Sequence, residues 1–223
     1  MRTFQEILDI AIARKGSEEA VFAGMVAPKS AQELADIPGK DWLAMMARGI
    51  FQAGIRWKVV EAKWPGIQEA FHGFDIARCA FMSEDWFDDL LSDRRVIRSA
   101  PKIRAIQHNA ILIQDIEAAG SSFGQKIADW PDEDYAGLLQ WLAKDGSRLG
   151  GSTGPYMLRF MGRDGYIPSR DVVARLVAEG VIDKAPSSQK ARAAMQAAIN
   201  TWRAESGRSL QEISRVLAQS IDG

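Results

Sequence analysis

The run Leu149-Gly-Gly-Ser-Thr-Gly-Pro-Tyr-Met-Leu-Arg-Phe160 leads from a glycine-rich turn directly into an apolar helix. Three glycines fall among the five residues 150–154, and Pro155 stands where the first helical turn would begin. Proline suits that position because the first N–H groups of a helix have no partner within it. Residues 146–162 are therefore predicted to form a hairpin between two helices.

Apolar residues recur at helical spacing on both sides of this hairpin, whereas alternating strand patterns do not persist. The fold class is therefore predicted to be all-α. Pro65 is expected to separate a short helix over 57–62 from another over 67–71, because proline disfavours a helix interior. The clearest apolar stripes are Phe4, Ile7, Leu8 and Ala11; Trp42, Met45, Met46 and Ile50; and Tyr135, Leu138, Leu139 and Leu142.

The composition of the 223 residues, 47% hydrophobic and 26% charged, is sufficient for a buried core. We expect one helical domain over 1–223, with two lobes as the alternative. The single cysteine, Cys79, has no disulfide partner, which points to a reducing compartment and a cytoplasmic protein. With only two histidines besides, no metal and no cofactor is expected. No apolar run reaches 18 residues, so no membrane partner is expected either.

The glycine turn has the properties of a phosphate-binding segment. Glycines let the backbone approach a ligand closely, and the N-terminus of the following helix attracts anions. These properties make Gly150, Gly151, Ser152, Thr153 and Gly154 candidates for contacting a DNA backbone. The alternative is an ordinary loop between helices. A nucleotide-binding P-loop is excluded because no Gly-Lys-Ser/Thr follows.

A second candidate for phosphate binding is a local cluster of basic residues. The net charge of −1 gives no global attraction to nucleic acid, so DNA binding would depend on such a cluster. Five basic residues fall in the eleven positions 94–104, of which Arg94, Arg95, Arg98 and Lys102 are the candidate contacts. The alternative is a solvated helix start whose charges pair with acidic neighbours such as Asp93.

Several short motifs then occur in the order found in one known family. The run Phe51-Gln-Ala-Gly-Ile-Arg-Trp57 resembles the Gln-Ala-Gly-Leu-Ser-Trp motif of the DNA-3-methyladenine glycosylase I family. Similar motifs follow at Phe71-His-Gly-Phe-Asp75, Val96-Ile-Arg98, Lys102-Ile103 and Asn109-Ala110. The resemblance covers about residues 42–176 and implies the helix-hairpin-helix glycosylase fold, with the hairpin at the glycine turn.

The sequence also departs from that family. Gly49 stands where the family places a glutamate that is implied to contact the flipped base, and the family's zinc-binding cysteines and histidines are missing. Residues 1–40 hold no counterpart of its aromatic and histidine-rich N-terminal motif. Arg170 stands where the wider superfamily has a catalytic aspartate, with Asp171 one residue later. The methyladenine branch manages without that aspartate, so the resemblance favours it over the lyase and adenine-removing branches.

The resemblance implies a pocket for an extruded base. We expect Trp57 to form its aromatic wall, because an indole face attracts both an aromatic ring and a cation, and alkylated adenine is both. Gln52 would read a base edge and Tyr156 would line the pocket. Asp171 is the candidate catalytic carboxylate. The alternatives are a core position for Trp57 and a helix-terminal acid that interacts with the helix dipole for Asp171.

Three functions follow from these observations. The first is a DNA-repair N-glycosylase without lyase activity, which acts on alkylated bases in double-stranded DNA, 3-methyladenine foremost, and needs no protein partner. The second is a DNA-binding protein of the same fold whose catalysis or specificity has changed, as Gly49 suggests. The third, independent of the resemblance, is a helical interaction domain that does not bind nucleic acid.

Overall fold

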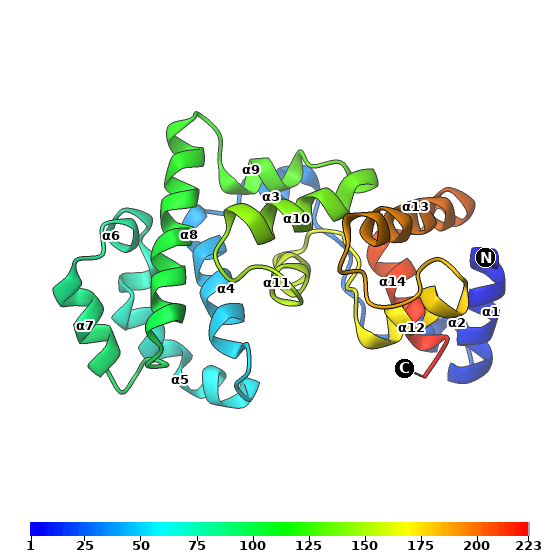
Figure 1. The fold of residues 1–223 in the computed structure, drawn as a ribbon, viewed down its shortest axis with the longest axis horizontal. Coiled ribbons are helices and arrows are strands. Elements are labelled where there is room, and N and C mark those ends of the chain that lie inside the picture. Colours follow the sequence, from blue (N-terminus) through cyan, green and yellow to red (C-terminus); the bar gives the residue numbers. More distant parts are fainter. Residues whose placement is uncertain (223) are drawn as a thin grey trace. The chain divides into compact units, whose positions relative to one another are not determined.

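The computed structural model of the protein describes residues 1–222, and no strand occurs within them (Figure 1). The predicted all-α class is confirmed. The chain divides into two compact units. The first unit combines Met1–Pro28, Pro131–Gly137 and the chain from Asp164 onward, and the second combines Lys29–Trp130 and Leu138–Arg163. Whether the units are lobes of one domain stays a prediction.

The first unit is built around the two long helices near the C-terminus. Helix α14 packs against α1 and α12, and the fully buried Trp202 of α13 donates its indole N–H to the carbonyl of Arg2 over 3.0 Å. The helices of this unit are α1 (Phe4–Lys15), α2 (Glu18–Phe22), α12 (Arg170–Ala178), α13 (Gln189–Ser206) and α14 (Leu210–Gln219), with the 3₁₀ turn η2 (Asp132–Asp134).

The second unit holds the central pair of helices α4 and α8, which pack against each other (Figure 1). Helix α8 also packs against α6, and α11 packs against α4. The bounds are α3 (Ala31–Ala35), α4 (Gly39–Gln52), α5 (Trp57–Ala70), η1 (His72–Phe74), α6 (Ile76–Ala80), α7 (Glu84–Ser92), α8 (Ala100–Ala118), α9 (Phe123–Ala128), α10 (Tyr135–Asp145, which begins in the first unit) and α11 (Thr153–Met161).

Local signals set most helix ends. Ser209 and Glu212 form a capping box at the start of α14, in which each side chain bonds the other residue's backbone N–H. Thr3 with Glu6 caps α1 in the same way. Gly54 ends the turn after α4 with φ of +74°, a conformation that glycine adopts without strain.

The expected break at Pro65 is wrong, because α5 runs unbroken from Trp57 to Ala70. Proline removes one helical hydrogen bond and frees the carbonyl four residues earlier, which belongs to Glu61. Both residues are exposed, so we attribute the continuity to hydration of this carbonyl. The buried Val60 and Ile67 hold the two halves of the helix in line on the core side.

Candidate base-binding site

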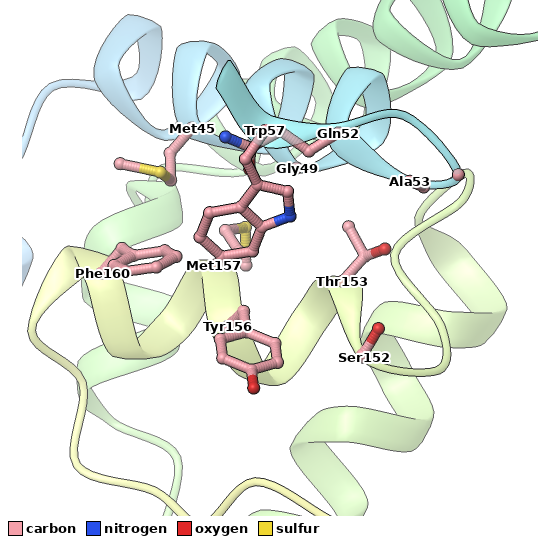
Figure 2. A pocket seen from close by; sticks show the side chains of 11 residues that line it. Met45, Gly49, Gln52, Ala53, Trp57, Ser152, Thr153, Tyr156, Met157 and Phe160 are labelled. Carbon is pink, nitrogen blue, oxygen red and sulfur yellow. The ribbon is translucent and has the colours of Figure 1, made fainter. Parts of the chain in front are cut away.

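A hollow of about 200 Å³ lies in the second unit, between the end of α4, the start of α5 and one side of α11. Figure 2 shows that aromatic side chains from α5 and α11 gather in it. Three residues predicted for the base pocket, Gln52, Trp57 and Tyr156, all line it. The complete lining is Met45, Gly49, Gln52, Ala53, Gly54, Trp57, Ser152, Thr153, Tyr156, Met157 and Phe160.

Trp57 is a surface residue with 50% of its area exposed, so the core alternative does not hold. Its ring stands edge-on to Tyr156, with centroids 6.2 Å apart, and to Phe160, with centroids 6.0 Å apart. Phe160 is itself 53% exposed. Large exposed aromatic rings that gather in one hollow are typical of a binding surface, because folding alone would bury them.

The turn between α4 and α5 places Trp57 in the hollow, and Lys102 holds this turn from α8. The Lys102 ammonium donates to the carbonyl of Phe51 over 3.1 Å and to that of Ala53 over 2.7 Å. These carbonyls lie at the end of α4, where the helix leaves them without internal partners. Burial, with a smaller effect of the nearby Arg148 charge, lowers the pKa of Lys102. Lys102 therefore stabilises the turn that borders the hollow. Its predicted contact with a phosphate stays a prediction.

A polar network joins Gln52, which lines the hollow, to Arg48 and Glu61. The Glu61 carboxylate accepts hydrogen bonds from the Gln52 amide nitrogen over 2.8 Å and from the Arg48 Nε over 2.8 Å, with a second bond from the Arg48 Nη2. The bonds from Arg48 are the main reason that the pKa of Glu61 is lowered. An adjoining hollow of about 420 Å³ is lined by Arg48 and Glu61 together with Met45, Gln52, Trp57 and Phe160.

Gly49 lets α4 and α11 approach closely at the hollow. A Cβ atom added there would lie 3.1 Å from the methyl group of Thr153, which is tighter than ordinary van der Waals contact. A glutamate at this position, as the resemblance leads one to expect, would have to displace Thr153 slightly. The glycine therefore both removes a carboxylate from the hollow and closes the gap between the two helices.

The predicted hairpin is present, but its glycines differ in exposure. Gly151 and Ser152 are exposed, Gly150 and Thr153 are half-buried, and Gly154 is buried. A Cβ on Gly154 would lie 2.5 Å from the Leu149 carbonyl oxygen, so this glycine serves close packing within the turn. The exposed part of the hairpin that can meet a phosphate is therefore centred on Gly151 and Ser152.

The basic cluster does not act as one patch. Arg95 pairs with Asp93 at 2.7 Å and with Glu69 at 3.1 Å, which is the intramolecular pairing given above as the alternative. Arg94 and Arg98 are exposed, and neither has an ion-pair partner within residues 1–222. Arg94 and Arg98 are therefore the members best placed to neutralise a phosphate.

We expect Arg98→Ala to weaken DNA binding equally for all sequences and to lower the slope of log affinity against log salt by about one, as for one lost phosphate contact. Arg95→Ala is the matched control and should change the slope less, because two carboxylates already neutralise Arg95. Binding isotherms at several salt concentrations measure both slopes. An unchanged slope for Arg98→Ala would contradict a role in phosphate contact.

Asp171 lies in the first unit, whereas every residue that lines the hollow belongs to the second. It sits in the first turn of α12, and one carboxylate oxygen lies 4.0 Å from the Arg170 Nε. It also lines a separate hollow of about 400 Å³ together with Arg14, Lys15, Arg170 and Arg215. This placement matches the helix-terminal alternative, and the catalytic role of Asp171 stays a prediction.

Among the residues at the hollows that sequence reasoning did not assign to the site are Met45, Arg48, Glu61 and Phe160. Helical spacing could have found Arg48, Glu61 and Phe160. Arg48 lies four residues before Gln52, Glu61 four after Trp57, and Phe160 four after Tyr156, so each shares a helix face with a residue that was predicted. Nothing in the sequence marks Met45 as different from the core positions around it.

Three further properties of residues 1–222 concern metal binding, cysteine reactivity and membrane insertion. No cluster of three His, Cys, Asp or Glu side chains suited to a metal ion occurs among residues 1–222. Cys79 is buried, and burial raises the pKa of its thiol to about 12. None of the helices in residues 1–222 combines the length and the apolar character needed to cross a bilayer.

Comparisons with known proteins agree with the motifs. The family model described as methyladenine glycosylase matches residues 39–136. DNA-3-methyladenine glycosylase 1 of Escherichia coli (strain K12) is 36% identical over 72 residues, which are 32% of this chain and 38% of that protein, so the match spans well under half of the relative. A crystal structure of 3-methyladenine DNA glycosylase I is 25% identical, with a TM-score of 0.49 over 61% of this chain and 81% of the other. A solution structure of 3-methyladenine DNA glycosylase I is 26% identical, with a TM-score of 0.47 over 57% and 79%.

Proposed function

We propose that this chain is a member of the methyladenine glycosylase family and acts as a cytoplasmic DNA N-glycosylase of base-excision repair that removes 3-methyladenine. The observation that carries the proposal is the half-exposed Trp57, framed by Tyr156 and Phe160 in a hollow. Base excision requires the nucleotide to leave the stack and enter such a pocket. A methylated adenine carries positive charge, which the face of an indole attracts.

The site does not need to activate the leaving group, because a cationic base already leaves readily when the glycosidic bond breaks. The remaining work is to hold the base, to orient a water molecule and to stabilise the developing oxocarbenium charge. Trp57 would hold the ring, and Ser152 and Thr153, which also line the hollow, carry hydroxyl groups that can orient water. None of the residues that line it is a lysine, which supports hydrolysis without a covalent lyase step.

The partner in this proposal is damaged double-stranded DNA, with no protein partner. The helix-hairpin-helix element would be α10, the glycine turn and α11, with Gly151 and Ser152 on the exposed side. Arg94 and Arg98 would add charge for the phosphates. Such contacts fix the position of the protein on the backbone, while selection of the lesion is left to the pocket.

A second candidate function is DNA binding without base release. The observation that favours it concerns the hollow of about 200 Å³ between α4, α5 and α11, which we call the Trp57 hollow. With glycine at position 49, no carboxylate lines this hollow. Asp171 belongs to the first unit and is not among the residues that line this hollow. In this case the aromatic hollow would hold an extruded base, and no hydrolysis would follow.

One experiment tests the proposal and separates the two functions. The protein is incubated with DNA treated with a methylating agent, released bases are analysed by chromatography, and binding to a duplex with an abasic analogue is measured in parallel. We expect 3-methyladenine to be released and the strand to stay intact at the abasic site. Binding of the analogue without base release would support the second candidate, and the absence of both would overturn DNA binding altogether.

A further inference from the structure

The polar network beside the hollow has a feature that bears on the choice of base, and the inference rests on the proposed function. Gln52 lines both hollows that Trp57 lines, so this residue borders the space that an extruded base would occupy. An amide can offer either an N–H donor or an oxygen acceptor to a base. Which of the two it offers depends on what holds the other end of the amide.

Glu61 determines this orientation. Its Oε1 lies 2.8 Å from the Gln52 Nε2. A carboxylate only accepts hydrogen bonds, so the amide must turn its nitrogen toward Glu61. A glutamate is ionised at neutral pH, and the bonds from Arg48 lower the pKa of Glu61 further, so the carboxylate keeps this preference.

Arg48 holds the carboxylate in place from two directions. Its guanidinium bonds both oxygens of Glu61, and its Cζ lies 5.4 Å from the centre of the Trp64 ring. The two-point bond and the ring contact restrict the rotation of Glu61. Gln52 keeps a second amide N–H and its Oε1, and no group of residues 1–222 donates a hydrogen bond to this oxygen, which the bond to Glu61 turns away from the carboxylate.

We propose that the Arg48–Glu61 pair fixes Gln52 so that its oxygen accepts a hydrogen bond from the exocyclic amine of an adenine-type base. Glu61 is then a positioning residue for selection of the base. A guanine-type base carries a carbonyl at the same ring position and would place two acceptors face to face. The pocket would therefore discriminate 3-methyladenine from 3-methylguanine, which carry the same methyl group and differ in the groups at this edge.

Two readouts test the proposal on the full-length protein. Calorimetry measures binding of free 3-methyladenine and of free 3-methylguanine, and chromatography measures release of the same two bases from methylated DNA. Each readout is expressed as the ratio of the two bases, which cancels differences in the active fraction of protein. We expect the parent protein to prefer 3-methyladenine by about tenfold, the usual effect of one satisfied against one unpaired hydrogen bond.

Glu61→Gln should bring this ratio close to one, because a second amide can accept or donate and no longer fixes Gln52. The Glu61 side chain is 42% exposed, so the fold should survive the change, and thermal melting verifies this. Glu84→Gln is the matched control. It removes a carboxylate from another exposed ion pair, with Arg104, and should leave the ratio unchanged.

A double-mutant cycle separates positioning from a merely structural role. In a Gln52→Ala background, Glu61→Gln should change the ratio no further, because Glu61 acts through Gln52. The inference would be overturned if Glu61→Gln kept the parent's ratio of 3-methyladenine to 3-methylguanine. It would also be overturned if adding Glu61→Gln to Gln52→Ala lowered the ratio below that of Gln52→Ala alone. Selective binding without base release would contradict the proposed function alone. Base release whose selectivity ignores Glu61 would contradict this inference alone.

Discussion

Trp57→Ala is expected to weaken binding to a duplex that carries a lesion or an abasic analogue by about 1–3 kcal/mol, or about 5- to 150-fold. This is the usual value of stacking a base on an aromatic side chain, and the half-exposed ring is free to provide it. Affinity for an undamaged duplex should change little, because its bases remain stacked. Competition binding with the two duplexes measures both effects.

Thermal stability should also change little in Trp57→Ala, because half of the side chain is already in water. Phe81→Ala is the matched control: Phe81 is 78% exposed but does not line the Trp57 hollow, so its removal should leave lesion binding intact. A Trp57→Ala protein that melts far below the parent, while it keeps the parent's preference for the lesion, would refute the stacking role.

Asp171→Asn completes the series. If it and Trp57→Ala both leave base release unchanged, the site described here is wrong even if the family is right.

Glu179→Ala is expected to cost the first unit about 3–5 kcal/mol of folding free energy, the range for breaking a buried ion pair. Arg175 and Glu179 are paired at 3.1 Å, and their side chains are only 6% and 2% exposed. Removal of the carboxylate would leave the buried guanidinium with its bonds to Ser220 but without a counter-charge. Chemical denaturation followed by circular dichroism measures the loss. Glu18→Ala, which breaks the more exposed pair with Arg208, should cost less than about 1 kcal/mol.

The pH dependence of folding stability provides a second test of the Arg175–Glu179 ion pair. Burial by itself raises the pKa of Glu179, but hydrogen bonds from Arg2 and Arg175 outweigh burial and hold the pKa below the ordinary value of 4.5. A depressed pKa in the folded state stabilises the protein above pH 4.5, and this contribution disappears as the pH falls through the lowered value. The stability difference between the parent and Glu179→Gln should therefore shrink in acid. A difference that stays constant would contradict the ion pair.

The helical fold could be predicted from the chain because its signals are short-range. The Ser209–Glu212 box and the stripe from Phe4 to Ala11 each join residues a few positions apart, so they are visible without any knowledge of the tertiary structure. The same holds for the hairpin at Gly151. Gln52, Trp57 and Tyr156 could be assigned to one pocket because the motifs resemble a family, and the structure places all three around one hollow.

Whether a charged side chain is paired, or an aromatic side chain exposed, depends on residues that are distant in the sequence. No local pattern reveals these contacts. Arg95 lies in a basic run, yet it is neutralised in part by Glu69, 26 positions away. Lys102 belongs to the same run, yet it binds the carbonyl of Phe51, 51 positions away. Periodicity gives Trp57 the features of a core residue, and only the packing of α4, α5 and α11 leaves it exposed. Helix formation depends on neighbours within one turn, whereas exposure and charge pairing depend on which distant surfaces fold together.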